Sequence, residues 1–464
     1  MATYARDGDP GCDSTNWNQR APNATGPTSN PETFRPALLN TTQWFDSINA
    51  LGAKIAVLTA KHGCGFLLWP TNATLPPVLS EEKDVRPFAS STSRMTKQQT
   101  TRRPPSPYGY HTNYDLLQDF VNSAEASGVG YGFYYSIMKN FFLCRSFEGT
   151  NSCAQTVLNG QHNVTDEEYH DIVNVHLTEL WTAYGDLAEV WIDSKLEGFG
   201  ALMDELQPLA GGTPSNPRQW CGTESGFPSK NVGPGPIWQT GTGFFGDPSS
   251  PNWVDKFCDP QLFRDHVWFY EPNRRVRSLD EMIPIYHDIV GRGMIMELAF
   301  AINRDGLLEK SHEAVYKQLG KWVENCYGTP VLSKQNTIGE RRIKLRLPSG
   351  SSGFRSFDRI VLREDVAIGQ RIRNYTIDLV YDNDSDNTGP EEVIATLVSN
   401  GTSVGRKRIH LLGEQHDDDC NFTEPMYNTE RNWSVVLTIT EEIGPPHLAM
   451  FGLYEPCYPE SSAQ

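Results

Sequence analysis

Apolar positions in the first 330 residues follow two alternating spacings. Short apolar runs rich in β-branched residues, typical of buried strands, alternate with segments whose apolar residues recur every three or four positions, as in helices. The predicted strands are 54–60, 130–137, 187–193, 266–272 and 293–302, and the predicted helices are 114–127, 166–185, 278–290 and 311–328. Such alternation implies a parallel sheet with crossover helices. We therefore expect an α/β catalytic domain over 1–330, folded as a (β/α) TIM-like barrel.

The pattern changes after Gly328. Short strand-like runs follow one another, separated by turn residues and without helical spacing. They are "RRIKLRLP", "FDRIVLRED", "NYTIDLVYD", "EVIATLVSN", "RKRIHLL", "WSVVLTIT" and "HLAMFGLYEP". This pattern predicts a C-terminal antiparallel β-sandwich domain over 331–464.

Segment 75–107 fits neither pattern. It is polar, rich in Ser, Thr, Arg and Pro, and lacks periodicity. Structureless loops of this length are uncommon in ordered domains, so we expect a disordered insertion that buries nothing. A flexible lid is the alternative.

Composition and charge exclude several classes of partner. The chain of 464 residues has a formal net charge of −17 and an isoelectric point near 5.1. An acidic surface repels phosphate backbones, so no nucleic-acid partner is expected. The longest apolar stretches, such as 293–302, are about half the length that spans a bilayer, so no membrane span is expected.

The cysteines give no sign of a metal site. There are nine, and none forms the CxxC pair of a structural zinc site. Cys144 and Cys153 bracket a short polar loop, and a disulfide between them is possible if the geometry allows. We expect no metal and no cofactor.

Glycosylation sequons are dense. Asn-x-Ser/Thr occurs at Asn23, Asn40, Asn72, Asn163, Asn374, Asn383, Asn400, Asn421 and Asn432. This density predicts a secreted, extracellular glycoprotein. The first residues, "MATYARDGDPGCD", nevertheless lack the apolar segment of a signal peptide.

The stretch "LTAKHGCGFLLWP" (58–70) contains the first candidate for chemistry. A buried strand ends there on Lys61 and His62, followed by a glycine-rich turn. In a barrel of this class the C-terminal ends of the strands carry the active site, which would place His62 there. The alternative is an ordinary core or loop histidine.

Two carboxylates follow similar lead-ins. Asp193 ends the apolar run "EVWID", although it could instead cap a following helix. Glu224 lies in "RQWCGTESG", where the central residue is not the serine of a nucleophile elbow. Paired acids near His62, Tyr134, Tyr135 and several tryptophans indicate glycoside hydrolysis, because aromatic faces pack on sugar rings.

These residues resemble the α-L-fucosidases of glycoside hydrolase family 29. "VLTAKHGCGFLLWP" resembles their "TAKHHDGFCLWP" stretch, "EVWID" resembles the strand with the nucleophile, and "RQWCGTESG" resembles the stretch with the acid/base glutamate. "SLDEMIPIYHDIVGRGMIMELAFAINRDGLL" is similar to their last barrel unit, and "FDRIVLREDVAIGQRI" and "GRKRIHLL" to their C-terminal β-sandwich. The resemblance covers nearly the whole chain except 75–107 and points to a fungal-type, secreted member.

The resemblance implies a retaining exo-glycosidase that releases terminal α-L-fucose from oligosaccharides or glycoproteins. Asp193 would attack the anomeric carbon, and Glu224 would protonate the leaving oxygen and then activate water. His62, Tyr135 and Trp220 would contact the sugar. Such a pair of carboxyl groups lies about 5 Å apart in retaining enzymes. A non-catalytic sugar-binding protein and a glycosidase of another specificity, such as a galactosidase, are the alternatives.

The sequence also departs from the family pattern. Gly63 and Cys64 replace a histidine and an aspartate. Glu224 follows Asp193 by only 31 positions (224 − 193), so Asp255 and Asp259 are reserve candidates for the acid/base. The first residues align just after the family's first barrel strand, so we expect an N-terminally truncated chain without that strand.

Overall fold

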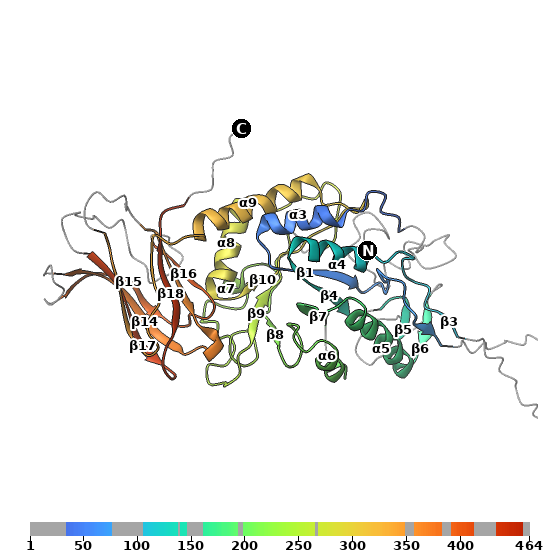
Figure 1. Cartoon of the computed structure of the whole chain (residues 1–464), viewed down its shortest axis with the longest axis horizontal. Helices are drawn as coiled ribbons and strands as arrows, with labels where there is room; N and C mark the ends of the chain where they lie inside the picture. Colours follow the sequence, from blue (N-terminus) through green and yellow to red (C-terminus); the bar gives the residue numbers. More distant parts are fainter. Residues whose placement is uncertain are drawn as a thin grey trace, which may run out of the picture.

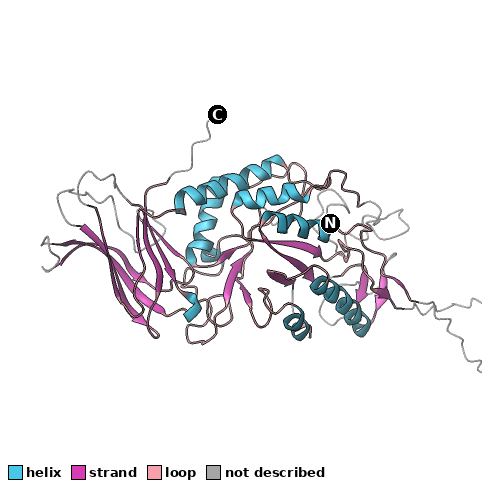
Figure 2. Cartoon of the chain, viewed as in Figure 1, coloured by secondary structure: helices cyan, strands magenta, loops and turns pink. Residues whose placement is uncertain are grey.

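The computed structural model describes residues 34–76, 105–137, 140–145, 161–193, 198–264, 268–348, 357–382, 391–412 and 433–457. Helices and parallel strands make up the part before residue 330, and antiparallel strands make up the part after it (Figure 1, Figure 2). The structure is thus mixed α/β with several sheets, in the order that the hydrophobic pattern predicts.

Two three-stranded parallel sheets form the centre of the first part. The first has the order β1-β4-β7 and the second β10-β9-β8. Their bounds are β1 Ile55–Lys61, β4 Gly130–Ser136, β7 Glu189–Asp193, β8 Arg218–Trp220, β9 Asp255–Cys258 and β10 Ile295–Met296. A single parallel bridge, Glu189 to Gly211, extends the first sheet beyond β7. Within the described ranges the strands do not close into a barrel.

Helices cover these strands from two sides (Figure 1). One group is α3 Thr41–Leu51, α4 Leu116–Ser127, α8 Leu279–Ile289 and α9 Lys310–Tyr327, and the other is α5 Asp166–Thr182 and α6 Gly200–Leu206. The helix ends follow local chemistry, since α5 begins with a capping box of Thr165 and Glu168. The predicted apolar face of α4 is buried at Leu116, Leu117, Phe120 and Val121.

The outer edges of the two sheets are β1 and β10. Among the strands of the described part of the chain, β1 pairs only with β4, and β10 only with β9. Ile55 and Ile295 on these strands are 43% and 39% exposed, which is unusual for sheet residues of this size. Residues 1–33 lie outside the described ranges, so the expected lack of a first strand stays a prediction.

The second part consists of two four-stranded antiparallel sheets with the orders β11-β18-β13-β16 and β12-β17-β14-β15. Both sheets contribute to one apolar core, which includes Ile343, Leu362, Ile377, Leu437 and Phe451. The strands are β11 Leu332–Lys334, β12 Arg342–Arg346, β13 Arg359–Glu364, β14 Ile372–Asp382, β15 Glu391–Gly401, β16 Arg408–Leu411, β17 Trp433–Glu442 and β18 Leu448–Tyr454. All seven predicted strands of this part are confirmed, and β11 is additional.

One predicted strand of the first part is wrong, and another is much shorter than predicted. Residues 268–272 form no strand, and only Ile295–Met296 of the segment 293–302 is paired. The strand between β8 and β10 is instead β9, whose sequence "DKFC" begins with two charged residues and therefore shows no apolar run. The apolar residues of 293–302 lie mostly in irregular backbone that packs on the core.

The ends of segment 75–107 pair with each other. β2 Thr74–Leu75 is antiparallel to β3 Ser106–Pro107, so the chain leaves and returns at one place. The expected disordered insertion lies otherwise outside the described residues, as does Cys153 of the expected Cys144–Cys153 disulfide. Two shorter elements, β5 Leu143–Arg145 and β6 His162–Val164, pair in parallel beside α5.

Candidate active site

Asp193 lies at the C-terminal end of β7, directly beside the end of β4. Ser136 and Asp193 are partners in the parallel register, and the Tyr134 hydroxyl donates to Asp193 Oδ2 at 2.5 Å. Burial and the Asp193 carboxylate together raise the pKa of Tyr134 well above its ordinary value, so this phenol stays a donor. The next helix that the structure describes, α6, has Phe199 as its N-cap, so Asp193 does not cap it.

Lys61 and His62 stand at the end of β1, on the other side of Tyr134. The His62 ring stacks on Tyr134 with a centroid distance of 5.7 Å and meets the edge of Phe269 at 5.1 Å. Lys61 is buried, donates to the Ser136 carbonyl and lies over the Tyr135 ring. Burial lowers the pKa of Lys61 to about 7, and the charge of Asp193 acts in the opposite direction. Lys61 and His62 therefore end this strand, with Lys61 close enough to Asp193 to interact electrostatically.

The turn after His62 depends on one glycine. Gly65 has a φ of +85°, and a Cβ there would lie 2.1 Å from Asn140 Oδ1. Any other residue would be strained and would collide with Asn140. The expectation that glycine allows the sharp turn is met at this position.

A second group of side chains lies at the ends of β8 and β9. Trp220 Nε1 donates to Asp259 Oδ1 at 2.7 Å, and Glu224 Oε2 accepts from Gln261 Nε2 and Trp268 Nε1 at 3.2 Å each. Burial raises the pKa of Asp259 to about 7; the Trp220 hydrogen bond opposes this rise, and the charges of Glu224 and Asp193 add to it. The Asp259 carboxyl therefore interacts electrostatically with both predicted catalytic carboxylates, Asp193 and Glu224. The side chains at the ends of β1, β4 and β7 and those at the ends of β8 and β9 thus belong to one site.

Asp255 does not belong to this site. It is buried at the opposite end of β9, where Arg406 contacts both carboxylate oxygens at 2.6 and 2.7 Å and Arg218 lies 3.3 Å away. Trp253 Nε1 donates to the same carboxylate. The Asp255 carboxylate is thus occupied by these ion pairs away from the site, so Asp259 is the reserve acid that the structure places near Glu224.

Tyr135 also lies apart from Asp193. Side chains alternate along β4, so Tyr135 points toward the helices when Tyr134 points toward Asp193. Tyr135 is 1% exposed, and its hydroxyl lies 2.9 Å from His176 Nδ1 of α5. The sugar contact expected of Tyr135 stays a prediction, and Tyr134 is the tyrosine that contacts Asp193.

Glu297 is a member of this region that sequence reasoning missed. It follows β10 directly and accepts a hydrogen bond from Trp191 Nε1 at 3.0 Å. Burial raises the pKa of Glu297 to about 7, and the charge of Asp259 contributes to the rise. The available signal was its place after the apolar run "GMIM", the same strand-end position that singled out Asp193.

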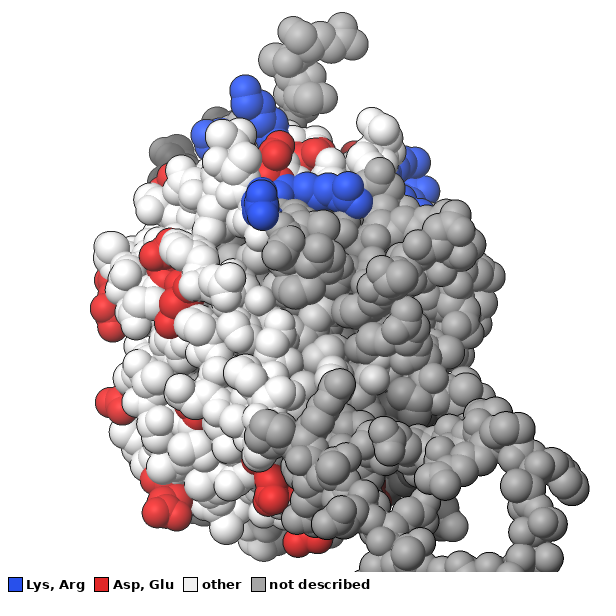
Figure 3. Space-filling model, turned by 90° about the vertical axis from the view of Figure 1, so that its right-hand side faces the viewer, with Lys and Arg blue, Asp and Glu red and all other residues white. Residues whose placement is uncertain are grey.

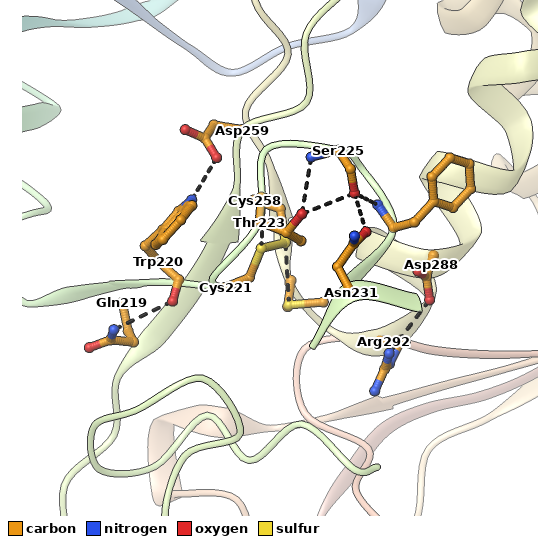
Figure 4. The surroundings of a disulfide bond; sticks show 12 residues. Gln219, Trp220, Cys221, Thr223, Ser225, Asn231, Cys258, Asp259, Asp288 and Arg292 are labelled. Atoms are coloured by element: carbon orange, nitrogen blue, oxygen red, sulfur yellow. Dashed lines mark hydrogen bonds and ion pairs between the residues drawn. A yellow bond between two sulfur atoms is a disulfide. The ribbon is translucent and has the colours of Figure 1, made fainter. Parts of the chain in front are cut away.

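A disulfide joins the two elements of the second group. Cys221 and Cys258 are bonded, and each adjoins a member of the Trp220–Asp259 hydrogen bond. Figure 4 shows the disulfide between that hydrogen bond and the polar cluster of Thr223, Ser225 and Asn231. The backbone N–H of Cys221 donates to the Phe257 carbonyl at 2.8 Å as well. Trp220 and Asp259 therefore lie just outside the loop that the disulfide closes, each next to one of the bonded cysteines.

Loss of this disulfide is expected to lower kcat. We expect kcat of the Cys221→Ser/Cys258→Ser double variant to fall about 10- to 100-fold, because small displacements of reacting groups slow a reaction strongly. Steady-state kinetics would measure the loss, with the Cys326→Ser/Cys457→Ser double variant as the control, since that second disulfide lies at the end of α9. Equal kcat in both double variants would show that the Cys221–Cys258 bond does not position the site.

Some absences are limited to the described part of the chain. No helix there is both long and apolar enough to cross a bilayer. Over the same residues, no three His, Cys, Asp or Glu side chains are grouped so as to hold a metal ion. On the face in Figure 3, acidic side chains are scattered and basic ones gather at the upper edge, among the residues that are coloured. The expectation of no cofactor and no nucleic-acid partner stays a prediction.

Comparison with known proteins identifies the family. The sequence model of α-L-fucosidase matches residues 14–328, which is more than half of the chain. The chain belongs to the α-L-fucosidase family. It is accordingly a glycoside hydrolase that acts on fucose.

Individual relatives are distant but extensive. The chain is 23% identical over 430 residues to α-L-fucosidase 1 of Arabidopsis thaliana, covering 82% of this chain and 74% of that protein. A glycoside hydrolase 29 family member from an unknown rumen bacterium has a similar fold, with a TM-score of 0.65, 19% identity and coverage of 97% of this chain and 75% of that one. A Ruminococcus gnavus family 29 fucosidase solved with fucose has a TM-score of 0.61 and 16% identity, and covers 95% and 89%.

Proposed function

We propose that this family member is a retaining exo-glycosidase that releases terminal α-L-fucose from glycans or glycoconjugates. The observation that carries the proposal is the convergence of Asp193, Glu224 and Asp259, in which Asp259 interacts electrostatically with the other two. Two carboxyl groups are what retaining hydrolysis requires, one as nucleophile and one as acid and base. The family match does not favour a non-catalytic sugar-binding protein or a galactosidase.

The steps follow from this arrangement. Asp193 attacks the anomeric carbon and forms a covalent fucosyl ester, while Glu224 gives its proton to the departing oxygen. Glu224 then takes a proton from water, and the resulting attack releases fucose and regenerates Asp193. The Tyr134 hydroxyl orients Asp193 in both steps, and His62, stacked on Tyr134, is placed to contact the sugar. Trp220 acts through Asp259, to which its indole donates.

The architecture fits the same proposal. We interpret β1, β4, β7, β8, β9 and β10 with their helices as a (β/α) TIM-like barrel over 1–330, and the two antiparallel sheets as a β-sandwich over 331–464. The site residues then follow the C-terminal ends of barrel strands, where such enzymes carry their chemistry.

Secretion of a glycoprotein, as in a fungal-type member, remains part of the proposal. Of the five sequon asparagines in the described ranges, Asn40, Asn72, Asn163 and Asn400 are exposed, and Asn374 is half-buried. Disulfides such as Cys221–Cys258 and Cys326–Cys457 persist mainly in oxidising compartments.

The direct test is hydrolysis of a panel of aryl glycosides. We expect turnover of the aryl α-L-fucoside and none of the aryl galactosides, because the proposal places fucose at Asp193. Proton NMR during the first minutes should show α-L-fucose before mutarotation, since two displacements restore the starting configuration. Initial release of the β-anomer, or turnover of a galactoside in place of the fucoside, would overturn the proposal.

A further inference from the structure

An exposed pair of phenylalanines lies next to the proposed acid/base. Phe244 and Phe245 are 47% and 36% exposed in the segment Thr240–Asp247, here called the aromatic loop. Solvent-exposed aromatic rings of this size, side by side, indicate a binding surface more often than a structural role.

The aromatic loop has a defined conformation. The Asp247 N–H donates to the Thr240 carbonyl, and the Thr240 hydroxyl donates to the Asp247 carbonyl, each at 2.7 Å. Gly246 has a φ of +74°, and a Cβ there would lie 1.8 Å from the Trp238 carbonyl oxygen. Arg373 of β14 donates to the Pro248 carbonyl at 2.6 Å, so the second part of the chain supports this loop. The phenylalanines are thus presented by a braced loop.

Phe244 contacts the segment that carries Glu224. A Cβ on Gly222, two residues before Glu224, would lie 2.9 to 3.0 Å from three Phe244 ring atoms, so the ring covers the Gly222 backbone. The Phe244 ring also meets Trp220 edge-on at 6.3 Å, and Trp220 donates to Asp259. The exposed ring therefore lies against Trp220 and against the backbone that leads to Glu224, at the end of β8.

We infer that Phe244 forms the binding subsite for the leaving-group sugar, the ring to which fucose is linked. This inference rests on the proposed function. The acid that protonates the leaving oxygen lies next to the leaving group, so a surface beside the segment that carries Glu224 is placed to receive the sugar beyond the scissile bond. The apolar C–H face of a pyranose packs on an aromatic ring, as it does on other exposed rings in sugar sites. The substrates are accordingly fucosylated oligosaccharides, whose second ring rests on Phe244.

Phe244→Ala tests this assignment with two substrates. α-L-Fucosyl fluoride has a leaving group too small to reach Phe244, whereas a fucosyl disaccharide has a ring that does. We expect the ratio of kcat/KM for the disaccharide to that for the fluoride to fall about tenfold in Phe244→Ala, and to recover in Phe244→Trp, because a stacked ring contributes binding of that order. An unchanged ratio in Phe244→Ala would overturn the inference.

Phe245→Ala is the matched control. It removes the same side chain from the same loop, but the Phe245 ring lies against Gly233 and not against Gly222. Its substrate ratio should stay within about twofold of the parent, well below the stacking contribution. An equal fall in both variants would assign the effect to loop disruption and would contradict a subsite at Phe244.

A binding measurement separates this inference from the proposed function. Calorimetric titration of the disaccharide into Asp193→Ala, with and without Phe244→Ala, requires no turnover. A Kd raised about tenfold by Phe244→Ala supports the subsite, and an equal Kd excludes it. A parent chain that hydrolyses neither substrate overturns only the proposed function, because the titration still decides the subsite.

Discussion

Asp193→Ala is expected to reduce kcat/KM for an aryl α-L-fucoside on the order of 10⁴-fold, as loss of a covalent nucleophile does in other hydrolases. The physical reason is that the Tyr134 hydroxyl fixes the Asp193 carboxylate at the end of β7, and alanine leaves no nucleophile at that position. Initial rates with the aryl fucoside would measure the effect. Asp171→Ala on the exposed face of α5 is the matched control and should keep the parental rate.

Added azide gives this prediction its specific signature. In Asp193→Ala the small anion fits the space that the carboxylate leaves, attacks the anomeric carbon directly and yields β-L-fucosyl azide, with inverted configuration. The restored rate should increase with azide concentration. Activity of Asp193→Ala near the parental level without azide would remove Asp193 from the nucleophile role.

Glu224→Gln is expected to lower turnover of a fucosyl oligosaccharide by about 10²- to 10⁴-fold, the usual contribution of general acid catalysis. With an activated aryl fucoside, the rate of the first step should fall much less in Glu224→Gln, because the phenolate leaves without a proton. The dependence of kcat/KM on leaving-group pKa measures this difference. A steep dependence in Glu224→Gln together with a shallow one in the parent chain would identify Glu224 as the acid.

Asp259→Asn is the informative comparison for the same role. Asp259 holds its proton up to about pH 7, since burial raises the pKa of its carboxyl to about that value. If Asp259 were the acid, activity would fall as the pH rises through 7. Asp259→Asn would then remove this fall from the pH–rate profile and would show the steep dependence of kcat/KM on leaving-group pKa. We expect the steep dependence in Glu224→Gln alone, and the reverse result would transfer the role to Asp259.

The sequence predicted which site residues lie at strand ends better than it predicted the directions of their side chains. Asp193 and His62 follow apolar runs that are strands in the structure, so their position could be predicted from hydrophobicity alone. Tyr134 and Tyr135 are adjacent and chemically equal, and only the register of β4 against its neighbours decides which of them faces Asp193.

The reserve acids show a different limit. Asp255 is the first residue of β9 and Asp259 follows its last residue, so the two lie about 13 Å apart along the extended chain. One therefore meets Arg218 and Arg406, and the other meets Trp220 and Glu224. No local pattern distinguishes these surroundings, because Arg406 comes from a distant part of the chain. The Cys221–Cys258 pairing likewise cannot be predicted from the positions of the nine cysteines, since spacing does not determine connectivity.

The bond between Cys326 and Cys457 makes the second part of the chain a body attached at two points. The chain leaves the last turn of α9 near Tyr327, builds both antiparallel sheets, and returns to the same turn through a disulfide that spans 131 residues. Closing a loop of this length removes roughly 5 kcal/mol of chain entropy from the unfolded state at 25 °C. A domain on a single linker can reorient freely relative to the rest of the chain, whereas this one is held both by its linker and by a disulfide. The disulfide therefore raises the effective concentration of Arg373 and Arg406 at their partners in the first part, Pro248 beside the aromatic loop and Asp255.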